Sequence, residues 1–246
     1  MIKIIISPKG KKYIIQEERE EDFHTDFGIL KKEDLNNAKI GETITTHLEK
    51  PFQVLKATVN DFIELMDRRC SILLPKDIGT VTSYTGLGSG DKVIDAGTGA
   101  AASALSFANI VGETGHVTSY EIREDFHTVA QKNVDTIGYN NLTLKNQDIK
   151  EGIMEKDVDL VFLDLPKPYE CFEHVYDALK MGGYLAVYAP YIEQLQISHR
   201  IGKKVGFKEI TPVEVLQREI EVRDRGTRPK TRMLGHSGYI VFARKL

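Results

Sequence analysis

Two glycines, one carboxylate and a run of alanines give residues 92–105 the clearest chemical signature in the sequence. The stretch is Lys-Val-Ile-Asp-Ala-Gly-Thr-Gly-Ala-Ala-Ala-Ser-Ala-Leu; the apolar residues before Asp95 predict a buried strand, and residues 100–110 predict a helix. Gly97 and Gly99 lie in the turn between them, where the missing Cβ permits a positive φ and close approach of a ligand. Because the start of a helix also offers unpaired N–H groups, the pattern predicts a pocket for a nucleotide-containing cofactor.

Two classes of cofactor fit this turn. Gly97-x-Gly99-x-x-Ala102 satisfies the loose dinucleotide fingerprint, in which an acidic residue about 20 positions later binds the ribose, and Glu121 is so placed. The spacing Asp95-x-Gly97-x-Gly99 is also that of S-adenosylmethionine enzymes. A structural alternative makes Asp95 a helix cap and the glycines an ordinary strand-to-helix turn. The turn alone leaves all three interpretations open.

Composition indicates an ordinary soluble globular protein. The 246 residues are 41% hydrophobic and 28% charged, with a net charge of −3. No apolar run approaches the ~20 residues that span a bilayer, and the short apolar run at the N-terminus lacks a signal-peptide cleavage site. The only cysteines, Cys70 and Cys171, form no disulfide framework or zinc pattern. We therefore expect a cytoplasmic protein with no membrane segment and no metal.

The chain divides into two predicted domains. Residues 1–60 contain short strand patterns with turns at Gly28 and Gly41, which predict a small β-rich, barrel-like domain. The strand patterns are 3–6, 12–15, 27–30 and 43–48, and the acidic run 17–22 is expected to be solvated. An amphipathic stretch at 61–67 opens the second domain, residues 61–246.

Strands and helices alternate through most of the second domain. An apolar strand is expected at residues 70–77, closed by Pro75, and a helix at 78–87. Strands follow at 93–95, 117–121, 142–145, 158–164 and 184–188, and helices at 100–110, 125–137, 170–179 and 192–205. The last strand segments, 207–222 and 238–244, have only a loop between them and should pair antiparallel. The result is an α/β, Rossmann-like, doubly wound, mostly parallel sheet whose ending favours a methyltransferase over a plain dinucleotide-binding domain.

Four carboxylates fall at or just beyond the ends of consecutive strands: Asp95, Glu121, Asp148 and Asp164. Open α/β sheets bind ligands at the carboxyl ends of their strands, so all four should line one rim. A carboxylate after the third strand, here Asp148, can accept the amino group of a bound adenine. Each acid alone could be a cap or turn residue.

The segment Asp164-Leu-Pro-Lys-Pro-Tyr169 is the second chemical signature. Its two prolines should keep the chain extended and project Asp164 and Tyr169 into the cleft. Methyltransferases that alkylate a base nitrogen often carry such a loop, in which the polar side chain binds the amino group of the base and the ring stacks on it. The alternative is that the prolines only end the strand.

Basic residues gather near the C-terminus, between Arg218 and Arg232. Charge runs usually form a solvated surface, but this one should border the active site and contact phosphates.

The chain resembles the archaeal and bacterial tRNA (adenine-N1)-methyltransferases that modify T-loop adenines, which are class I S-adenosylmethionine-dependent enzymes. The matching segments are Leu74-Pro-Lys-Asp77, Asp95-Ala-Gly-Thr-Gly99, Ser119-Tyr-Glu-x-Arg123, Asp164-Leu-Pro-Lys-Pro-Tyr169, Arg228-Pro229 and Gly235-His-Ser-Gly238. The chain departs from the family pattern where Tyr169 replaces Trp, Ala100-Ala101 replaces Ser-Gly and Phe126 replaces His.

The residue patterns and the resemblance together imply S-adenosylmethionine as cofactor, tRNA as substrate and a homotetrameric assembly. The expected cofactor-binding residues are Asp95, Gly97, Thr98, Gly99, Ala101, Ala102, Glu121, Arg123, Asp148 and Asp164. Asp164 and Tyr169 are the expected catalytic residues, and the expected RNA-binding residues are Arg223, Arg225, Arg228, Lys230 and His236. A structural role for His236 fits equally well.

The implied reaction is direct methyl transfer to N1 of an unpaired or flipped adenine, with Asp164 binding its N6 amino group. Three alternatives stay open. The first is a non-catalytic tRNA-binding subunit, which would be expected to have lost the glycine turn and Asp164. The second is a methyltransferase acting on isoaspartyl protein or a small molecule, and the third is an NAD oxidoreductase.

Overall fold

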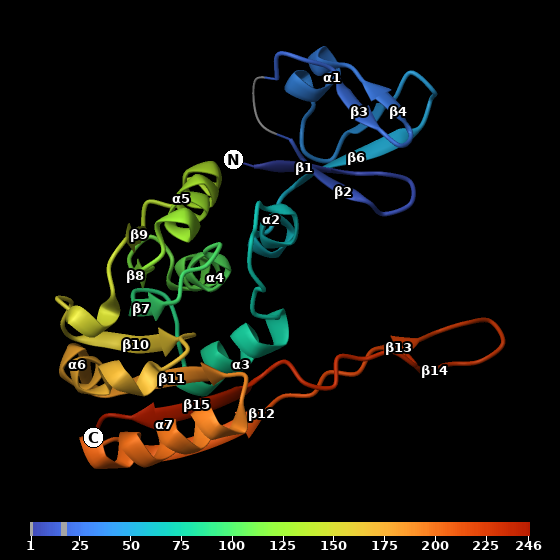
Figure 1. Ribbon diagram of the computed structural model, residues 1–246. Helices are drawn as coiled ribbons and strands as arrows, with labels where there is room; N and C mark the ends of the chain where they lie inside the picture. Colours follow the sequence, from blue (N-terminus) through green and yellow to red (C-terminus); the bar gives the residue numbers. More distant parts are fainter. Residues whose placement is uncertain (1, 16–18) are drawn as a thin grey trace. The chain divides into compact units, whose positions relative to one another are not determined.

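The computed structural model describes residues 2–15 and 19–246, which form two compact units (Figure 1). The first runs to Asp67 and includes Asp135–Gly138; the second comprises Arg68–Val134 and Tyr139–Leu246. The domain boundary expected after residue 60 stays a prediction. Of the acidic run 17–22, residues 17 and 18 lie outside the described residues.

The first unit is β-rich, as predicted. Its described residues form a four-stranded antiparallel sheet of order β2-β1-β6-β5 and a separate β3–β4 hairpin. The strands are β1 Lys3–Ile6, β2 Lys12–Ile15, β3 Phe23–Thr25, β4 Gly28–Leu30, β5 Thr43–Thr45 and β6 Pro51–Lys56, with helices α1 Lys32–Asn37 and α2 Val59–Leu65. Ile5, Leu30, Phe52 and Val54 form the centre of its core. The strand that begins at Pro51 and helix α1 were not predicted.

The second unit is built on a seven-stranded sheet, counted over its described residues, with the order β12-β15-β11-β10-β7-β8-β9. The strands are β7 Lys92–Ala96, β8 His116–Tyr120, β9 Leu142–Lys145, β10 Val158–Leu163, β11 Leu179–Ala189, β12 Lys208–Glu214 and β15 Tyr239–Arg244. Strands β7 to β11 are parallel, whereas β15 pairs antiparallel with both β11 and β12. The predicted fold class, including the antiparallel ending, is confirmed.

Helices cover both faces of this sheet, as a parallel sheet with buried strands requires (Figure 1). They are α3 Pro75–Thr85, α4 Ala102–Val111, α5 Glu124–Ile137, α6 Phe172–Ala178 and α7 Ile192–Val205. Helix α4 packs on β7, β8 and β9, whereas α6 and α7 pack on each other and on β11. None of the helices among the described residues is long and apolar enough to cross a membrane.

Two predicted elements differ from the structure. Residues 71–74 are not a strand, and helix α3 begins at Pro75, because proline at the first helical position has a preset φ and lacks an N–H that would be unpaired there. The helix predicted at 170–179 starts as a 3₁₀ turn, η2 Pro168–Cys171, before α6.

The strand predicted at 207–222 is wrong beyond Glu214, where β12 ends, and the segment between β12 and β15 carries a hairpin of its own. Strands β13 Ile220–Glu221 and β14 Arg228–Pro229 pair antiparallel and project from the second unit (Figure 1). We call residues 215–238 the arm.

Candidate active site

Three of the four predicted carboxylates come together at the carboxyl edge of the central sheet. Asp95 lies near the end of β7, Glu121 follows β8 and Asp164 follows β10. Burial raises the pKa of Asp95 to about 6, and the charge of Glu121 adds to this effect. Burial, and then the charge of Asp95, raise the pKa of Asp164 to about 7. This edge therefore concentrates acidic groups whose ionised forms a cationic ligand would stabilise.

The glycine turn packs against this edge through backbone contacts. Gly97 and Gly99 have φ values of 89° and 55°, which confirms the predicted positive φ. A Cβ at Gly97 would lie 2.1 Å from the carbonyl oxygen of Asp164, and one at Gly99 would lie 2.9 Å from Cys70 Sγ. Glycine is thus required here by the chain's own contacts, and not only by approach of a ligand as the sequence suggested.

The carboxylate of Glu121 closes the turn from the neighbouring strand. Its Oε2 accepts a hydrogen bond from the N–H of Gly99 at 2.9 Å, and its Oε1 accepts one from the N–H of Arg123 at 2.9 Å. The guanidinium of Arg123 pairs with Asp125 at 2.9 Å and lies 3.8 Å from the ring centroid of Phe126. Arg123 therefore donates to Glu121 through its backbone N–H, whereas its guanidinium donates to Asp125.

Buried hydroxyls fix Asp95 beneath the turn. Thr98 Oγ1 lies 2.6 Å from Ser119 Oγ, which donates to Oδ2 of Asp95 at 2.5 Å. Since the Thr98 hydroxyl is used within the protein, any contact of Thr98 with a cofactor would fall mainly to its backbone. The turn ends at Ala101, which is buried with a left-handed φ of 72°, and α4 begins at Ala102.

The remaining predicted residues of this edge differ in their surroundings. Asp148 is half-buried, and its Oδ1 accepts from the N–H of Lys150 at 3.0 Å, which leaves Oδ2 to face another donor. The chain does not stay extended to Tyr169 as predicted, because it winds into η2 after Lys167. Tyr169 is half-buried against the core cluster that contains Phe172.

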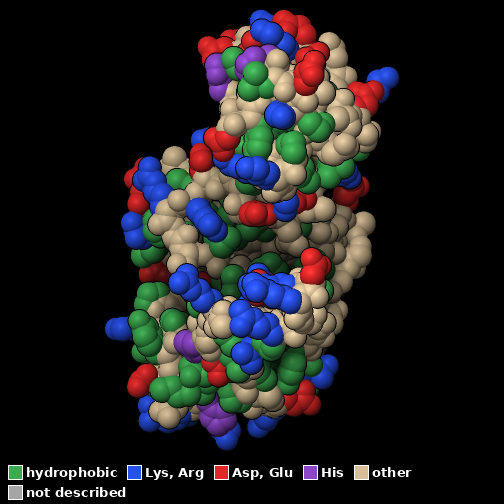
Figure 2. Space-filling view, turned by 90° about the vertical axis from the view of Figure 1, so that its right-hand side faces the viewer, with side chains coloured by type: hydrophobic (Ala, Val, Ile, Leu, Met, Phe, Trp, Pro, Cys, Tyr) green, Lys and Arg blue, Asp and Glu red, His purple; other side chains and the backbone are tan. Residues whose placement is uncertain are grey.

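The basic residues of the arm are exposed, and Lys and Arg side chains gather on the face towards which the arm projects (Figure 2). Three of the four predicted RNA-binding cations pair with acids of the arm itself: Arg223 and Arg228 with Glu221, and Lys230 with Glu219. Arg225, the fourth, has no ion pair with any of the residues that the structure describes. These cations thus pair with local, exposed acids, and water or a polyanion can replace those acids as partners.

His236 lies at the base of the arm and is held by two acceptors. Its Nδ1 lies 2.7 Å from Glu214 Oε1, and its Nε2 lies 3.0 Å from the carbonyl oxygen of Pro190. The Glu214 hydrogen bond, and then that to Pro190, raise the pKa of His236. These contacts give His236 a structural role, and its contact with RNA stays a prediction.

Comparison with known proteins assigns the chain to a family. Residues 52–228 match the family described as the tRNA methyltransferase complex GCD14 subunit. The chain belongs to this tRNA methyltransferase family. It is 36% identical to a tRNA (adenine(57)-N(1)/adenine(58)-N(1))-methyltransferase TrmI of Methanocaldococcus jannaschii, over 98% of this chain and 94% of the relative. It is 30% identical to a tRNA (adenine(58)-N(1))-methyltransferase TrmI of Thermus thermophilus, over 96% and 94%.

Two solved structures share the methyltransferase fold over the whole chain. A protein of Thermotoga maritima, described as an S-adenosylmethionine-dependent O-methyltransferase, superimposes with a TM-score of 0.90 and 32% identity, covering 100% of this chain and 92% of that chain. A tRNA (m1A58) methyltransferase TrmI of Aquifex aeolicus superimposes with a TM-score of 0.81 and 24% identity, covering 100% and 97%. The second likeness supports the fold alone.

Sequence reasoning missed several residues that the fold of this tRNA methyltransferase brings to the site. Cys70 contacts the glycine turn, although its segment was expected to be a strand. Burial raises the pKa of its thiol, and the charges of Glu121 and Asp164 raise it further. Gln194 of α7 donates from Nε2 to the carbonyl oxygen of Pro166 at 2.8 Å and so holds the loop after Asp164. The family segments around Lys76 and Ser237 are also in contact, because Lys76 Nζ donates to Ser237 Oγ. The family motifs were the only sequence signal for that contact.

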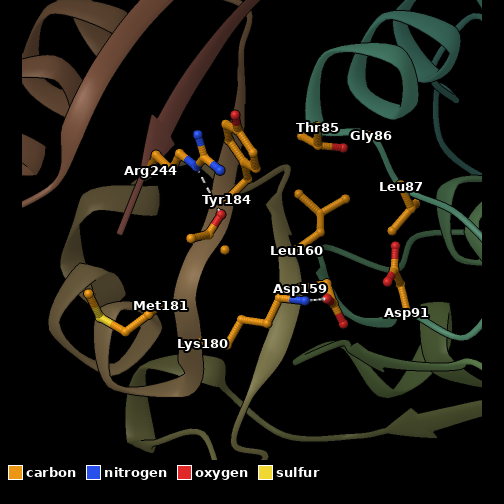
Figure 3. A pocket seen from close by; sticks show the side chains of 12 residues that line it. Thr85, Gly86, Leu87, Asp91, Asp159, Leu160, Lys180, Met181, Tyr184 and Arg244 are labelled. Carbon is orange, nitrogen blue, oxygen red and sulfur yellow. Dashed lines mark hydrogen bonds and ion pairs between the residues drawn. The ribbon is translucent and has the colours of Figure 1, made fainter. Parts of the chain in front are cut away.

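A separate cavity of about 310 Å³ lies at the opposite edge of the sheet, where β10 and β11 begin (Figure 3). Its charged side chains already have partners: Lys180 pairs with Asp159, and Arg244 donates from Nε to the carbonyl oxygen of Gly182 at 3.0 Å. Since none of the predicted site residues lines this cavity, we do not assign it to the methyltransferase site.

Proposed function

We propose that this protein transfers the methyl group of S-adenosylmethionine to N1 of an adenine in the T-loop of tRNA, of the position 57 or 58 type. The observation that carries the proposal is the contact between Gly97 and the backbone of Asp164, at which an added Cβ would lie 2.1 Å from the carbonyl oxygen. The residue that would bind the target base is thereby fixed to the turn that would bind the cofactor. The full-length similarity to enzymes named for this reaction supports it.

The residues of the edge fit S-adenosylmethionine by their chemistry. The cofactor supplies an electrophilic methyl group on a positively charged sulfur. Asp95, Glu121 and Asp164 are acids whose ionised forms a nearby cation favours. Each oxygen of Glu121 accepts one backbone N–H and keeps a second acceptor site, which suits ribose hydroxyls. Asp148 can accept the adenine amino group through Oδ2.

In the proposed mechanism, the protein positions the base and stabilises charge. N1 of adenine is a neutral lone-pair nucleophile, so no base has to remove a proton before attack. Ionised Asp164 accepts a hydrogen bond from the N6 amino group and stabilises the positive charge that develops on the ring. Tyr169 is proposed to stack on the base. The remaining requirement is alignment of N1 with the methyl group, which the fixed geometry of this edge provides.

The arm is proposed to bind the tRNA backbone. N1 lies on the Watson–Crick edge, so the adenine has to leave its pairing or stacking partners before it reaches Asp164. Arg223, Arg225, Arg228 and Lys230 are exposed cations that can contact the displaced phosphates. We further propose a homotetramer acting in the cytoplasm, in keeping with the family resemblance.

A second candidate function is methyl transfer to an oxygen atom of another substrate. It is favoured by the description of the Thermotoga maritima protein as an O-methyltransferase. The exposed basic arm and the acid at Asp164 favour a nucleic-acid base over such a substrate, because an oxygen nucleophile usually needs a base to remove its proton.

Incubation of the protein with labelled S-adenosylmethionine and unmodified tRNA transcript, followed by nucleoside analysis, tests the proposal. We expect N1-methyladenosine at the T-loop, and mapping of the label distinguishes one modified adenine from two adjacent ones. Label in another nucleoside would keep the methyltransferase and refute the base assignment. Bound cofactor with no label in any tRNA would refute tRNA as the substrate.

A further inference from the structure

The ammonium group of Lys76 lies at the centre of a buried polar cluster. Its Nζ donates to Asp77 Oδ1, to the carbonyl oxygen of Val215 and to Ser237 Oγ, each at 2.7 Å. Ser237 Oγ in turn donates to Asp77 Oδ2 at 3.2 Å. The side chains of Lys76 and Asp77 are only 9% and 1% exposed. A buried charge pair of this kind is favourable only where hydrogen bonds satisfy the remaining donors and acceptors of both groups.

The partners of Lys76 lie on the two legs of the arm. Val215 directly follows β12 and begins the arm, whereas Ser237 is the second-to-last residue of the arm, two positions before β15 begins. One ammonium group therefore joins both legs to the first turn of α3. The arm has only a short backbone ladder, because its strands β13 and β14 are two residues long, and its ion pairs are exposed. Its direction must depend on how its base is held.

A second tie at the base leads to the catalytic edge. His236 binds Glu214, the last residue of β12, and the carbonyl oxygen of Pro190 after β11. The hydroxyl of Tyr188 donates to the carbonyl oxygen of Ser237, and a Cβ at Gly238 would lie 2.4 Å from the Tyr188 ring. Burial raises the pKa of the Tyr188 hydroxyl, and the charges of Asp77 and Asp164 raise it further. The base of the arm is thus in contact with the strand next to Asp164.

We propose that Lys76 is a positioning residue that fixes the direction of the arm relative to the edge carrying Asp164. It does so by holding Val215 and Ser237 together against α3. This inference rests on the proposed function, in which the arm binds tRNA while Asp164 binds the adenine. If the base of the arm were free, the arm could still meet phosphates, but rarely at the distance from Asp164 that the flipped base requires.

Two kinds of variant test the inference. Lys76→Met combined with Asp77→Asn removes the ammonium without leaving a buried charge unpaired. Ser237→Ala removes only the two hydrogen bonds of its hydroxyl, one from Lys76 and one to Asp77, and Ser237→Thr restores the hydroxyl. Lys180→Met is the control, since Lys180 pairs with Asp159 at the opposite edge. Steady-state kinetics with tRNA and with S-adenosylmethionine, and amide hydrogen exchange of residues 215–238, are measured for each.

We expect the double variant to raise KM for tRNA about tenfold, with kcat and KM for the cofactor changed less than about twofold. Ser237→Ala should do the same to a smaller extent, Ser237→Thr should recover, and Lys180→Met should match the parent protein. Exchange should quicken in the arm and stay unchanged in β7 to β11. A merely structural role would lower kcat through loss of active protein and leave KM for tRNA unchanged.

Unchanged exchange in the arm, or a fall in kcat alone, would overturn the positioning role. The exchange measurement also separates the two proposals. If the parent protein methylates no tRNA but the arm still loosens in the variant, the proposed substrate is wrong and the anchoring by Lys76 stands.

Discussion

The carboxyl edge of the sheet and the arm carry opposite charges and use them in opposite ways. At the edge, Asp95 is fully buried and Asp164 is half-buried, and the loss of contact with water raises their pKa values to about 6 and about 7. In the arm, Arg223 and Lys230 are exposed and pair with acids two and eleven residues away in sequence. The reactivity of the edge therefore depends on tertiary surroundings, whereas the charge of the arm follows from local sequence.

This difference predicts separate consequences for substitutions in the two regions. A change at the edge should alter the chemical step and its pH dependence. A change in the arm should alter tRNA affinity and its response to salt, because phosphate contacts release counterions.

The largest effect is expected from Asp164→Ala. Loss of the group that stabilises charge on the adenine should lower kcat on the order of a hundred- to thousandfold. Cofactor binding should be largely retained, because the contact of Asp164 with Gly97 is made by its backbone and its N–H donates to the carbonyl oxygen of Ala96 at 2.9 Å. Single-turnover kinetics and calorimetric titration with S-adenosylmethionine measure the two quantities. Unchanged turnover would remove Asp164 from the mechanism.

The next largest effect is expected from replacing Arg223, Arg225, Arg228 and Lys230 together with Gln. Loss of phosphate contacts should weaken tRNA binding on the order of tenfold to a hundredfold and reduce the slope of log affinity against log salt. Filter binding over a range of salt concentrations measures both.

The acids of the arm provide a matched control of opposite sign. Glu219→Gln with Glu221→Gln frees the paired cations and should tighten binding. Equal salt slopes in all three proteins would show that the arm does not contact phosphates.

A smaller effect is expected from pH. In the proposed mechanism only ionised Asp164 accepts the amino group, and the pKa of Asp164 is raised to about 7, so kcat/KM should fall about tenfold from pH 8 to pH 6. Asp164→Asn should abolish this dependence and leave a low, flat rate.

The same pKa shift affects stability with a definite sign. The pKa of Asp164 is higher in the folded protein than in the unfolded chain. Its ionisation therefore lowers the free energy of unfolding as pH rises. Asp164→Asn should therefore raise the unfolding temperature of the cofactor-free protein more at pH 8 than at pH 5. A larger gain at pH 5 would contradict the burial of this acid.

The smallest effect is expected from Ala101→Gly. Ala101 has a left-handed φ of 72°. This conformation strains a residue that has a Cβ but does not strain glycine. The greater chain entropy of glycine and the loss of the buried methyl group offset this relief, so the free energy of unfolding should change by less than about 0.5 kcal/mol. Ala104→Gly, inside α4, should instead destabilise the protein by about 1 kcal/mol or more. Urea denaturation distinguishes the two magnitudes.

Much of the fold followed from periodicity, because local patterns determine strands and helices that pack in the ordinary way. The prediction of residues 192–205 as a helix matches α7, and that of residues 142–145 matches β9. The strand predicted at 70–77 was wrong because an apolar run before a proline suits either a strand end or the approach to a helix. Proline at the first helical position favours the second, and Cys70 and Lys76 of this segment then contact Gly99 and Ser237.

The sequence by itself determined that acids and a glycine turn occupy the ends of parallel strands, since strand polarity puts all such ends at one edge. It also determined the charge of the arm. Only the tertiary structure decided that Gly97 is required by the backbone of Asp164, that Cys70 lies under Gly99, and that Lys76 holds the base of the arm. The reason is physical. Burial and contacts between residues up to 161 positions apart depend on how the elements pack, which no local pattern encodes.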